Sequence, residues 1–389
     1  MIYIKIIIQS ICFFCSKVIS ILFSVCEIKG NKVFFYSYRG NKYADNQRSF
    51  TEYYLEKGEN DLEIVWGYRN DATRDSIPEG VKKVKMISFK YFYHLYTSRF
   101  ISTNQRISFL DFISKRHGQV YIQTWHASAA LKKIEVDALR DLPEIYVREA
   151  KRDSKMTDLI ISGSRQYSEV YKNKFWYNGP LLEIGTMRND VLFKDNNTRV
   201  KIIKQKLQIP LNQKVVLYAP TFRNNPDLSI NFDFDYGMNY EMISEAFEKM
   251  IGENIILVKQ HPNLKNHKLT ETKWSRDITD YQDIQELLLI ADVLVTDYSS
   301  VLFDFILMKK PLFIYASDFD TYSRDFMVDL NEMPCSISRN NEQLKESILI
   351  FNDKEYLDRL YDFDKKHIGT FETGNANKDF YKYLKKNIN

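Results

Sequence analysis

The chain has 389 residues, of which 44% are hydrophobic and 27% charged, and its formal net charge is +4. This composition is typical of a globular protein with about two domains, and it excludes a disordered or fibrous chain. So small a net charge gives no reason to expect nucleic acid binding, but it fits a mild preference for anionic surfaces or phosphate-bearing substrates. Four cysteines form no disulfide framework, which indicates a reducing compartment.

The first 25 residues form an apolar stretch that Lys5 and Lys17 interrupt. No uncharged run within it reaches the roughly 18 residues of a spanning helix, and it lacks the small-residue cleavage site of a removed signal peptide. Because lysine amines can reach water while their stems lie along lipid, we expect residues 1–30 to associate with a membrane as an interfacial anchor. A tilted spanning helix and an ordinary core helix stay open as alternatives.

Strands and helices alternate from residue 31 onward. Short apolar runs separated by helical segments are typical of a parallel sheet with helices on both faces. The pattern predicts strands at residues 31–37, 63–68, 83–87, 100–103, 120–124 and 158–162, with helices at 46–57 and 165–174.

A charged, asparagine-rich segment at residues 194–199 precedes a second alternation. The two halves predict an α/β fold with two Rossmann-like domains, at residues 31–198 and 199–389, whose ligands bind at the carboxyl ends of the strands. In the second half we expect strands at 215–219, 255–259, 292–296 and 311–315, and helices at 241–251, 283–290 and 300–308.

Two histidines follow predicted strands. His126 comes after the strand at 120–124, and His261 comes after the strand at 255–259, where Pro262 ends the strand. A histidine in such a place can take a proton from an acceptor hydroxyl, or it can donate to a phosphate and stabilise its charge. Each position also suits an ordinary hydrogen-bonded or turn histidine.

A possible anion site follows the strand at 292–296, where Asp297, Ser299 and Ser300 lead into a predicted helix. Backbone N–H groups converge at such a helix start and can bind a diphosphate, although ordinary capping by Asp297 or a serine explains the same residues. A single arginine is more often a solvated surface residue, but several that follow strands favour phosphate binding. These candidates are Arg188, Arg223 and Arg324.

Other nucleotide and metal motifs are missing from the sequence. There is no GxxxxGK[ST] motif, no HExxH motif and no cysteine–histidine cluster. Three Asp-Phe-Asp triplets occur in an acidic, phenylalanine-rich chain, and we attribute their spacing to chance. We therefore expect no metal and no cofactor.

Taken together, these segments resemble the CDP-glycerol glycerophosphotransferase family of teichoic-acid and capsule synthesis. The strongest likeness is DIQELLLIADVLVTDYSSVLFDF at residues 283–305. Supporting segments are QTWH at 123–126, GTMRND at 185–190, YAPTFR at 218–223 and KQHP at 259–262. Their order and spacing extend over about residues 31–335, so the match as a whole is specific although no single motif is.

The resemblance implies a GT-B-like fold, with an N-terminal acceptor domain and a C-terminal nucleotide-donor domain. It implies transfer of glycerol phosphate from CDP-glycerol to a hydroxyl of a membrane-linked glycan or teichoic-acid acceptor, with release of CMP at the cytoplasmic face of the membrane. In this family pattern His126 is the general base and His261 assists at the diphosphate. The implied donor-binding residues are Arg188, Arg223, Glu286, Thr296, Asp297, Ser299, Ser300 and Arg324.

One segment departs from the family pattern. The family usually has WHG(T/S)P where this chain has Trp-His-Ala-Ser-Ala at residues 125–129, and the loss of glycine and proline constrains the loop differently. Three alternatives follow. They are a variant that uses CDP-ribitol, a nucleotide-sugar glycosyltransferase of GT-B fold, and a membrane-surface scaffold that has lost activity.

Overall fold

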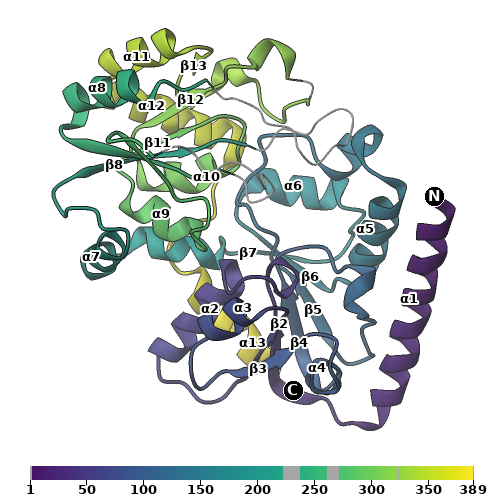
Figure 1. Cartoon of the computed structure of the whole chain (residues 1–389). Coiled ribbons are helices and arrows are strands. Elements are labelled where there is room, and N and C mark those ends of the chain that lie inside the picture. The colour runs from purple at the N-terminus through teal and green to yellow at the C-terminus, as the bar shows by residue number, and fades with distance from the viewer. Residues whose placement is uncertain (1, 222–236, 261–270, 323, 389) are drawn as a thin grey trace. The chain divides into compact units, whose positions relative to one another are not determined.

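The computed structural model describes residues 2–221, 237–260, 271–322 and 324–388, so Arg223 and His261 lie outside the described residues (Figure 1). The chain divides into two compact units, which are described separately. Unit 1 comprises Met1–Ser128, Ile134–Asp190 and Thr370–Asn389, and unit 2 comprises Ala129–Lys133 and Val191–Gly369.

Unit 1 contains a parallel sheet of seven strands in the order β3-β2-β1-β4-β5-β6-β7. The strands are β1 Lys29–Phe35, β2 Glu63–Tyr68, β3 Lys82–Lys85, β4 Ser98–Thr103, β5 Val120–Gln123, β6 Leu159–Ser162 and β7 Leu181–Glu183. The helices are α1 Ile2–Leu22, α2 Asp45–Glu56, α3 Asp71–Ser76, α4 Phe89–Tyr96, α5 Glu144–Met156, α6 Arg165–Lys174 and α13 Ala376–Lys386.

The core of unit 1 has two layers because successive side chains of a strand point to opposite faces of the sheet. On β1, the Phe35 ring packs edge-on against Phe50 of α2, with the ring centroids 5.8 Å apart. The neighbouring Phe34 ring meets Tyr91 of α4, with the centroids 5.6 Å apart. A strand that is apolar at consecutive positions is thus buried on both faces, as expected for a parallel sheet.

Unit 2 contains six parallel strands in the order β10-β9-β8-β11-β12-β13. The strands are β8 Lys214–Ala219, β9 Asn254–Val258, β10 Ser275–Asp277, β11 Val293–Thr296, β12 Leu312–Tyr315 and β13 Ile337–Ser338. The helices are α7 Asn197–Lys206, α8 Tyr240–Ile251, α9 Ile284–Ile290, α10 Val301–Phe305, α11 Asn341–Leu349 and α12 Asp353–Phe363.

Both sheets have the strand order of doubly wound nucleotide-binding folds, which confirms the predicted α/β class with two Rossmann-like sheets. In each sheet the order reverses between two central strands, β1 and β4 in unit 1 and β8 and β11 in unit 2. Ligands of such folds bind beyond the carboxyl ends of the strands at this switch point. The loops after these four strands are therefore where functional residues should lie.

The end of the described chain belongs to unit 1 rather than to unit 2. Two backbone N–H groups at the start of α13, from Ala376 and Asn377, donate to the carboxylate of Asp190 at 2.9 and 2.8 Å. The Phe380 ring packs edge-on against Phe50 of α2, with the centroids 4.9 Å apart. The division of the chain into an acceptor domain at 31–198 and a donor domain at 199–389 stays a prediction.

Candidate active-site groups in two units

At the switch point of unit 1, the loops after β1 and β4 are tied together. Tyr38 lies in the loop after β1, and Asn104 directly follows β4. The backbone N–H of Tyr38 donates to the side-chain oxygen of Asn104 at 2.9 Å. This contact sets the spacing of the two loops at the place where ligands bind in this class of fold.

His126 follows the next strand, β5, and its ring is oriented by Asn104. The Nδ1 atom of His126 lies 2.8 Å from the backbone oxygen of Asn104. Because a carbonyl oxygen only accepts hydrogen bonds, Nδ1 carries the hydrogen and Nε2 holds a lone pair. Burial lowers the pKa of His126, so the ring is neutral near pH 7. A neutral, oriented imidazole is suited to accept a proton.

Arg188, a predicted phosphate ligand, lies beside His126. Its guanidinium donates to the backbone oxygen of His126 at 2.7 Å and lies 3.5 Å from the carboxylate of Asp45. Its backbone N–H donates to the Asn46 side-chain oxygen at 3.1 Å. Arg188 is buried, so these contacts make it part of the support for the His126 loop. Its role in binding phosphate stays a prediction.

Behind His126 lies an aromatic and ionic support. The Trp125 ring stacks on the imidazole with centroids 4.5 Å apart, and Trp125 has a φ of +51°, which is rare outside glycine. The guanidinium of Arg106 lies 5.7 Å from the centre of the Trp125 ring and pairs with Asp153 at 3.0 Å. The altered residues 127–129 of this loop are buried, and the Ser164 hydroxyl donates to the Ser128 backbone oxygen at 2.7 Å.

At the switch point of unit 2, Thr296 and Asp297 join the ends of β8 and β11. The Thr296 hydroxyl donates to the backbone oxygen of Ala219 at 2.7 Å. One carboxylate oxygen of Asp297 accepts from the backbone N–H of Thr221 at 2.8 Å and from its hydroxyl at 2.5 Å. Thr296 and Asp297 are buried, so both side chains shape this edge of the sheet.

Ser299 and Ser300 lie in the turn that follows, directly before α10. Both are half-buried. The Ser299 hydroxyl accepts a 3.4 Å hydrogen bond from the backbone N–H of Val301, and Ser300 precedes the helix without a side-chain cap. The turn is thus near the predicted anion site, whose role in binding a diphosphate stays a prediction.

The remaining predicted residues of unit 2 lie in other contacts. Glu286 on α9 accepts from the hydroxyl of Tyr281 at 2.6 Å and pairs with Arg199 at 3.2 Å. Arg324 donates to the backbone oxygen of Lys133 at 3.3 Å. These contacts neither establish nor exclude donor binding by the two side chains.

Our strand-end analysis missed Asn104 as a functional candidate. It is the first residue after the predicted strand at 100–103, so the rule that selected His126 would also have selected it. We noted Asp45 and Asn46 only for their family likeness, because no strand directly precedes them. Their placement beside His126 comes from the turn of residues 38–44, which strand and helix periodicity does not define.

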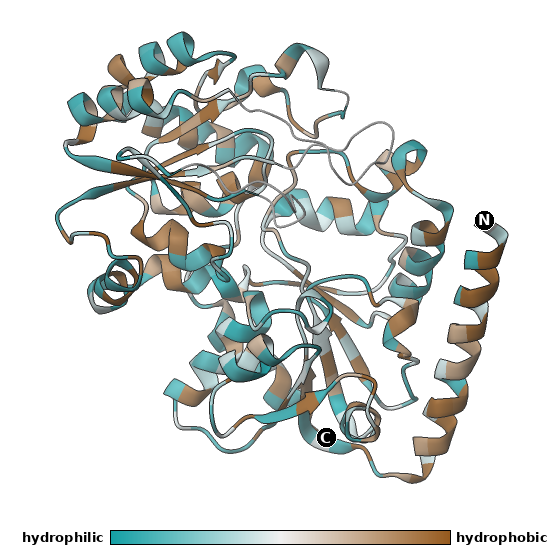
Figure 2. Cartoon of the chain, in the orientation of Figure 1, coloured by the Kyte–Doolittle hydropathy of each residue, from teal (hydrophilic) through white to brown (hydrophobic). Residues whose placement is uncertain are grey.

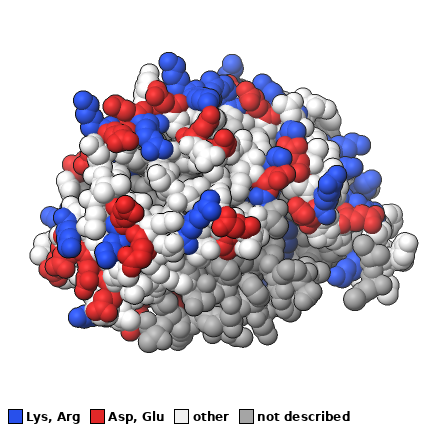
Figure 3. Space-filling view, turned by 90° about the horizontal axis from the view of Figure 1, so that it is seen from above, with Lys and Arg blue, Asp and Glu red and all other residues white. Residues whose placement is uncertain are grey.

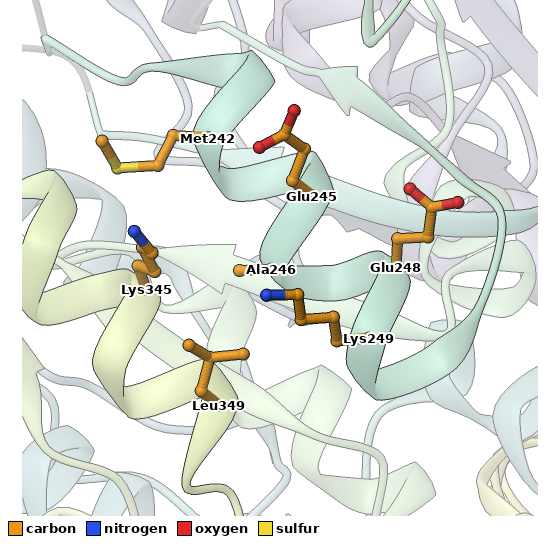
Figure 4. Close-up of a pocket in the computed structure, with 7 residues that line it drawn as sticks. All are labelled: Met242, Glu245, Ala246, Glu248, Lys249, Lys345 and Leu349. Atoms are coloured by element: carbon orange, nitrogen blue, oxygen red, sulfur yellow. The ribbon is translucent and has the colours of Figure 1, made fainter.

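The surface outside the switch points offers no comparable chemistry. A pocket of about 460 Å³ lies between α8 and α11, but it holds none of the predicted residues and its charged side chains are of both signs (Figure 4). On the face seen in Figure 3, positive and negative side chains are likewise interspersed. Within the described residues, no group of three His, Cys, Asp or Glu side chains could hold a metal ion.

Comparisons with known proteins agree with the sequence resemblance. A model of the family described as CDP-Glycerol:Poly(glycerophosphate) glycerophosphotransferase matches residues 18–386. The chain is 31% identical over 361 residues to the teichoic acid glycerol-phosphate transferase of Staphylococcus aureus (strain NCTC 8325 / PS 47), covering 89% of this chain and 90% of that protein. It is 32% identical over 332 residues to the teichoic acid poly(glycerol phosphate) polymerase of Bacillus spizizenii (strain ATCC 23059 / NRRL B-14472 / W23), covering 81% and 82%.

Solved structures with the same architecture include the wall teichoic acid polymerase TagF. It matches with a TM-score of 0.82 and 26% identity, over 99% of this chain and 96% of that chain. A variant of that polymerase soaked with CDPG matches equally well, with a TM-score of 0.82. The UDP-GlcNAc 2-epimerase of Neisseria meningitidis, at 13% identity and a TM-score of 0.52 over 92% of this chain and 100% of that chain, shares the fold alone. These matches confirm the predicted GT-B-like fold.

Proposed function

The chain belongs to the CDP-glycerol:poly(glycerophosphate) glycerophosphotransferase family, and from this premise we propose how it transfers glycerol phosphate from CDP-glycerol in teichoic acid synthesis. The acceptor in our proposal is a hydroxyl of a membrane-linked glycan, either a teichoic acid or a capsule polymer. The acceptor oxygen attacks the phosphorus that bears glycerol. A new P–O bond forms, and the P–O bond to the departing CMP breaks with its electron pair.

His126 is the general base of this proposal. The observation that carries it is the 2.8 Å contact between Nδ1 and the backbone oxygen of Asn104, because this contact leaves the Nε2 lone pair to take the proton of the acceptor hydroxyl. Cationic groups must offset the charge of the departing CMP. Arg223, Arg324 and His261 are the candidates for that role from the sequence.

The N-terminal helix supports a membrane-bound acceptor. The part from Tyr3 to Val25 is long and apolar enough to cross a membrane by length and composition, and Figure 2 shows α1 as predominantly hydrophobic. Its polar side, however, is docked on unit 1. The Gln9 amide donates to the Ile145 backbone oxygen at 3.0 Å, and Arg152 of α5 donates to the Ser16 hydroxyl at 3.2 Å.

The opposite side of α1 is apolar and exposed. The exposed fractions are 58% for Ile7, 55% for Ile11 and 68% for Phe14, and Lys5 and Lys17 are exposed as well. A helix that binds protein with its polar side and leaves its apolar side uncovered is suited to lie in the membrane interface. We therefore propose that α1 lies on the cytoplasmic face of the membrane rather than spanning it.

The test compares nucleotide donors. Purified protein is incubated with a lipid-linked glycan acceptor and with CDP-glycerol, CDP-ribitol or a UDP-sugar, and the released nucleotide is quantified. We expect acceptor-dependent CMP release from CDP-glycerol. CMP from CDP-ribitol alone would identify the ribitol variant, and UDP release would contradict the proposal. The absence of any turnover would favour the scaffold alternative.

A further inference from the structure

Asp45 has an unusual backbone and almost no contact with solvent. It begins α2 with a φ of +68°, and only 5% of its surface is exposed. A left-handed conformation at a residue other than glycine costs about 1–3 kcal/mol and persists only where surrounding contacts hold it. The sequence analysis assigned Asp45 no chemical role.

Four donors converge on the Asp45 carboxylate. One oxygen accepts from the Tyr38 hydroxyl at 2.8 Å and from the Asn104 side-chain amide at 3.0 Å. The other accepts from the backbone N–H and the side-chain amide of Asn46, at 2.8 and 3.0 Å. A carboxylate can accept all four bonds with its two oxygens, so Asp45 joins the loop after β1 to the residue after β4.

The residues that Asp45 holds are the ones that hold His126. Asn104 gives its backbone oxygen to Nδ1 of His126, while its side chain is bound by Asp45. Arg188 donates to the backbone oxygen of His126 and lies 3.5 Å from Asp45. Asn46 accepts from the backbone N–H of Arg188. Asp45 thus reaches His126 through two separate routes, one to the ring and one to the backbone.

We infer that Asp45 is a positioning residue of the transfer reaction, which fixes Asn104 and Arg188 so that His126 presents Nε2 to the acceptor hydroxyl. The inference rests on the proposed function, since it requires His126 to act as the base. Asp45 itself does not touch substrate in this proposal. Its effect is exerted through the orientation and the charge environment of the imidazole.

The charge of Asp45 gives the inference a signature that simple loss of structure would lack. Burial lowers the pKa of His126, the hydrogen bond to Asn104 and the charge of Asp45 raise it, and Arg188 lowers it. Among the described residues, Asp45 from α2 and Arg188 from the loop before α7 are the charged groups that act on His126. Removing the negative charge should therefore lower the pKa of His126 and extend activity to lower pH.

The experiment measures kcat and the pH profile of kcat/KM for CMP release by the full chain in Asp45→Asn and Glu149→Gln. Glu149 is a matched buried carboxylate of unit 1 that accepts from Phe109 N–H at 2.7 Å. We expect Asp45→Asn to lower kcat roughly 10- to 100-fold, as for carboxylates that orient other functional histidines. The acid limb of its profile should move to lower pH, while Glu149→Gln keeps the wild-type limb.

Two further variants separate the possible failures. Tyr38→Phe removes one donor and keeps the charge, so we expect a smaller loss of kcat and an unmoved acid limb, and this variant carries the test if Asp45→Asn does not fold. An unchanged kcat in Tyr38→Phe, or an unmoved limb in a folded Asp45→Asn, would overturn the positioning role. If His126→Ala retains wild-type turnover, the proposed base is wrong instead.

Discussion

The two switch points of this protein are built in different ways. In unit 1, the groups around His126 bind one another, and Asp45, Asn104 and Arg188 form a closed set of hydrogen bonds. In unit 2, Thr296 and Asp297 fix the edge of the sheet, but the turn that follows leaves Ser299 and Ser300 half-buried beside a short helix. Both sites use the same strand order.

The difference separates chemistry from binding. A base must be held in one orientation and one protonation state before the substrate arrives, which requires a pre-formed set of contacts. A nucleotide site needs donors that are still accessible to the ligand. We therefore expect damage in unit 1 to reduce turnover and damage in unit 2 to weaken donor affinity.

The largest expected effect comes from His126→Ala. Loss of a general base typically reduces the rate by roughly 10²–10⁴-fold, so kcat for CMP release should fall within that range. The affinity for CDP-glycerol, measured by calorimetry, should stay near the wild-type value. A large loss of affinity instead would remove the contrast between the two units.

A smaller effect is expected for Asp297→Ala in unit 2. The substitution leaves the N–H and hydroxyl of Thr221 without their acceptor, which costs about 1–3 kcal/mol where donors are buried. The KM for CDP-glycerol should rise while kcat changes little. Asp280→Ala, at an exposed position, is the control. Equal KM values in the two variants would show that this edge does not shape the donor site.

The pH profile sharpens the comparison further within unit 1. Because the pKa of His126 is lowered by burial, the base stays unprotonated below the usual histidine pKa of about 6.5. Activity should therefore persist below that pH and fall only at the lowered pKa of the imidazole. An acid limb of kcat/KM at or above pH 6.5 would contradict a buried base.

Membrane binding should depend on unit 1 through the exposed side of α1. Ile11→Ser should weaken binding to anionic vesicles roughly tenfold, because burying an isoleucine side chain is worth about 1.5–3 kcal/mol. Co-sedimentation with vesicles measures the effect. Cys12→Ser, on the docked side of the same helix, should bind vesicles like the wild type. The reverse ranking would place the wrong side of α1 in the membrane.

The smallest effect is expected for Asp190→Asn. The asparagine keeps one acceptor for the N-terminus of α13 but loses the negative charge, which is worth about 0.3–1 kcal/mol at a helix start. Thermal unfolding should show that decrease in the free energy of unfolding. Asp358→Asn, at an exposed position of α12, should leave stability unchanged.

Much of the fold could be predicted from the sequence because the central strands are long and apolar. The predicted strand at 63–68 and helix at 165–174 have the observed bounds. The strands β7, β10 and β13 have three, three and two residues, which is too short for periodicity to define. The return of α13 to unit 1 is a long-range contact, and local patterns carry no signal for it.

The candidate site was predictable to a lesser degree. Strand ends marked His126, Thr296 and Asp297 because the carboxyl ends of parallel strands share one edge of a sheet. The contacts of Asp45 depend on a left-handed residue and an irregular turn. These are set by packing of the finished fold rather than by the periodicity of the chain.

The attachment of the last helix to the first sheet has a consequence for biosynthesis. During translation, residues 370–388 follow the whole of unit 2, so the Asp190 carboxylate cannot bind its α13 donors until unit 2 has left the ribosome. Unit 1 must wait with an uncovered apolar face, the one that receives Phe380. The nascent chain is thus expected to need protection by chaperones through most of its synthesis.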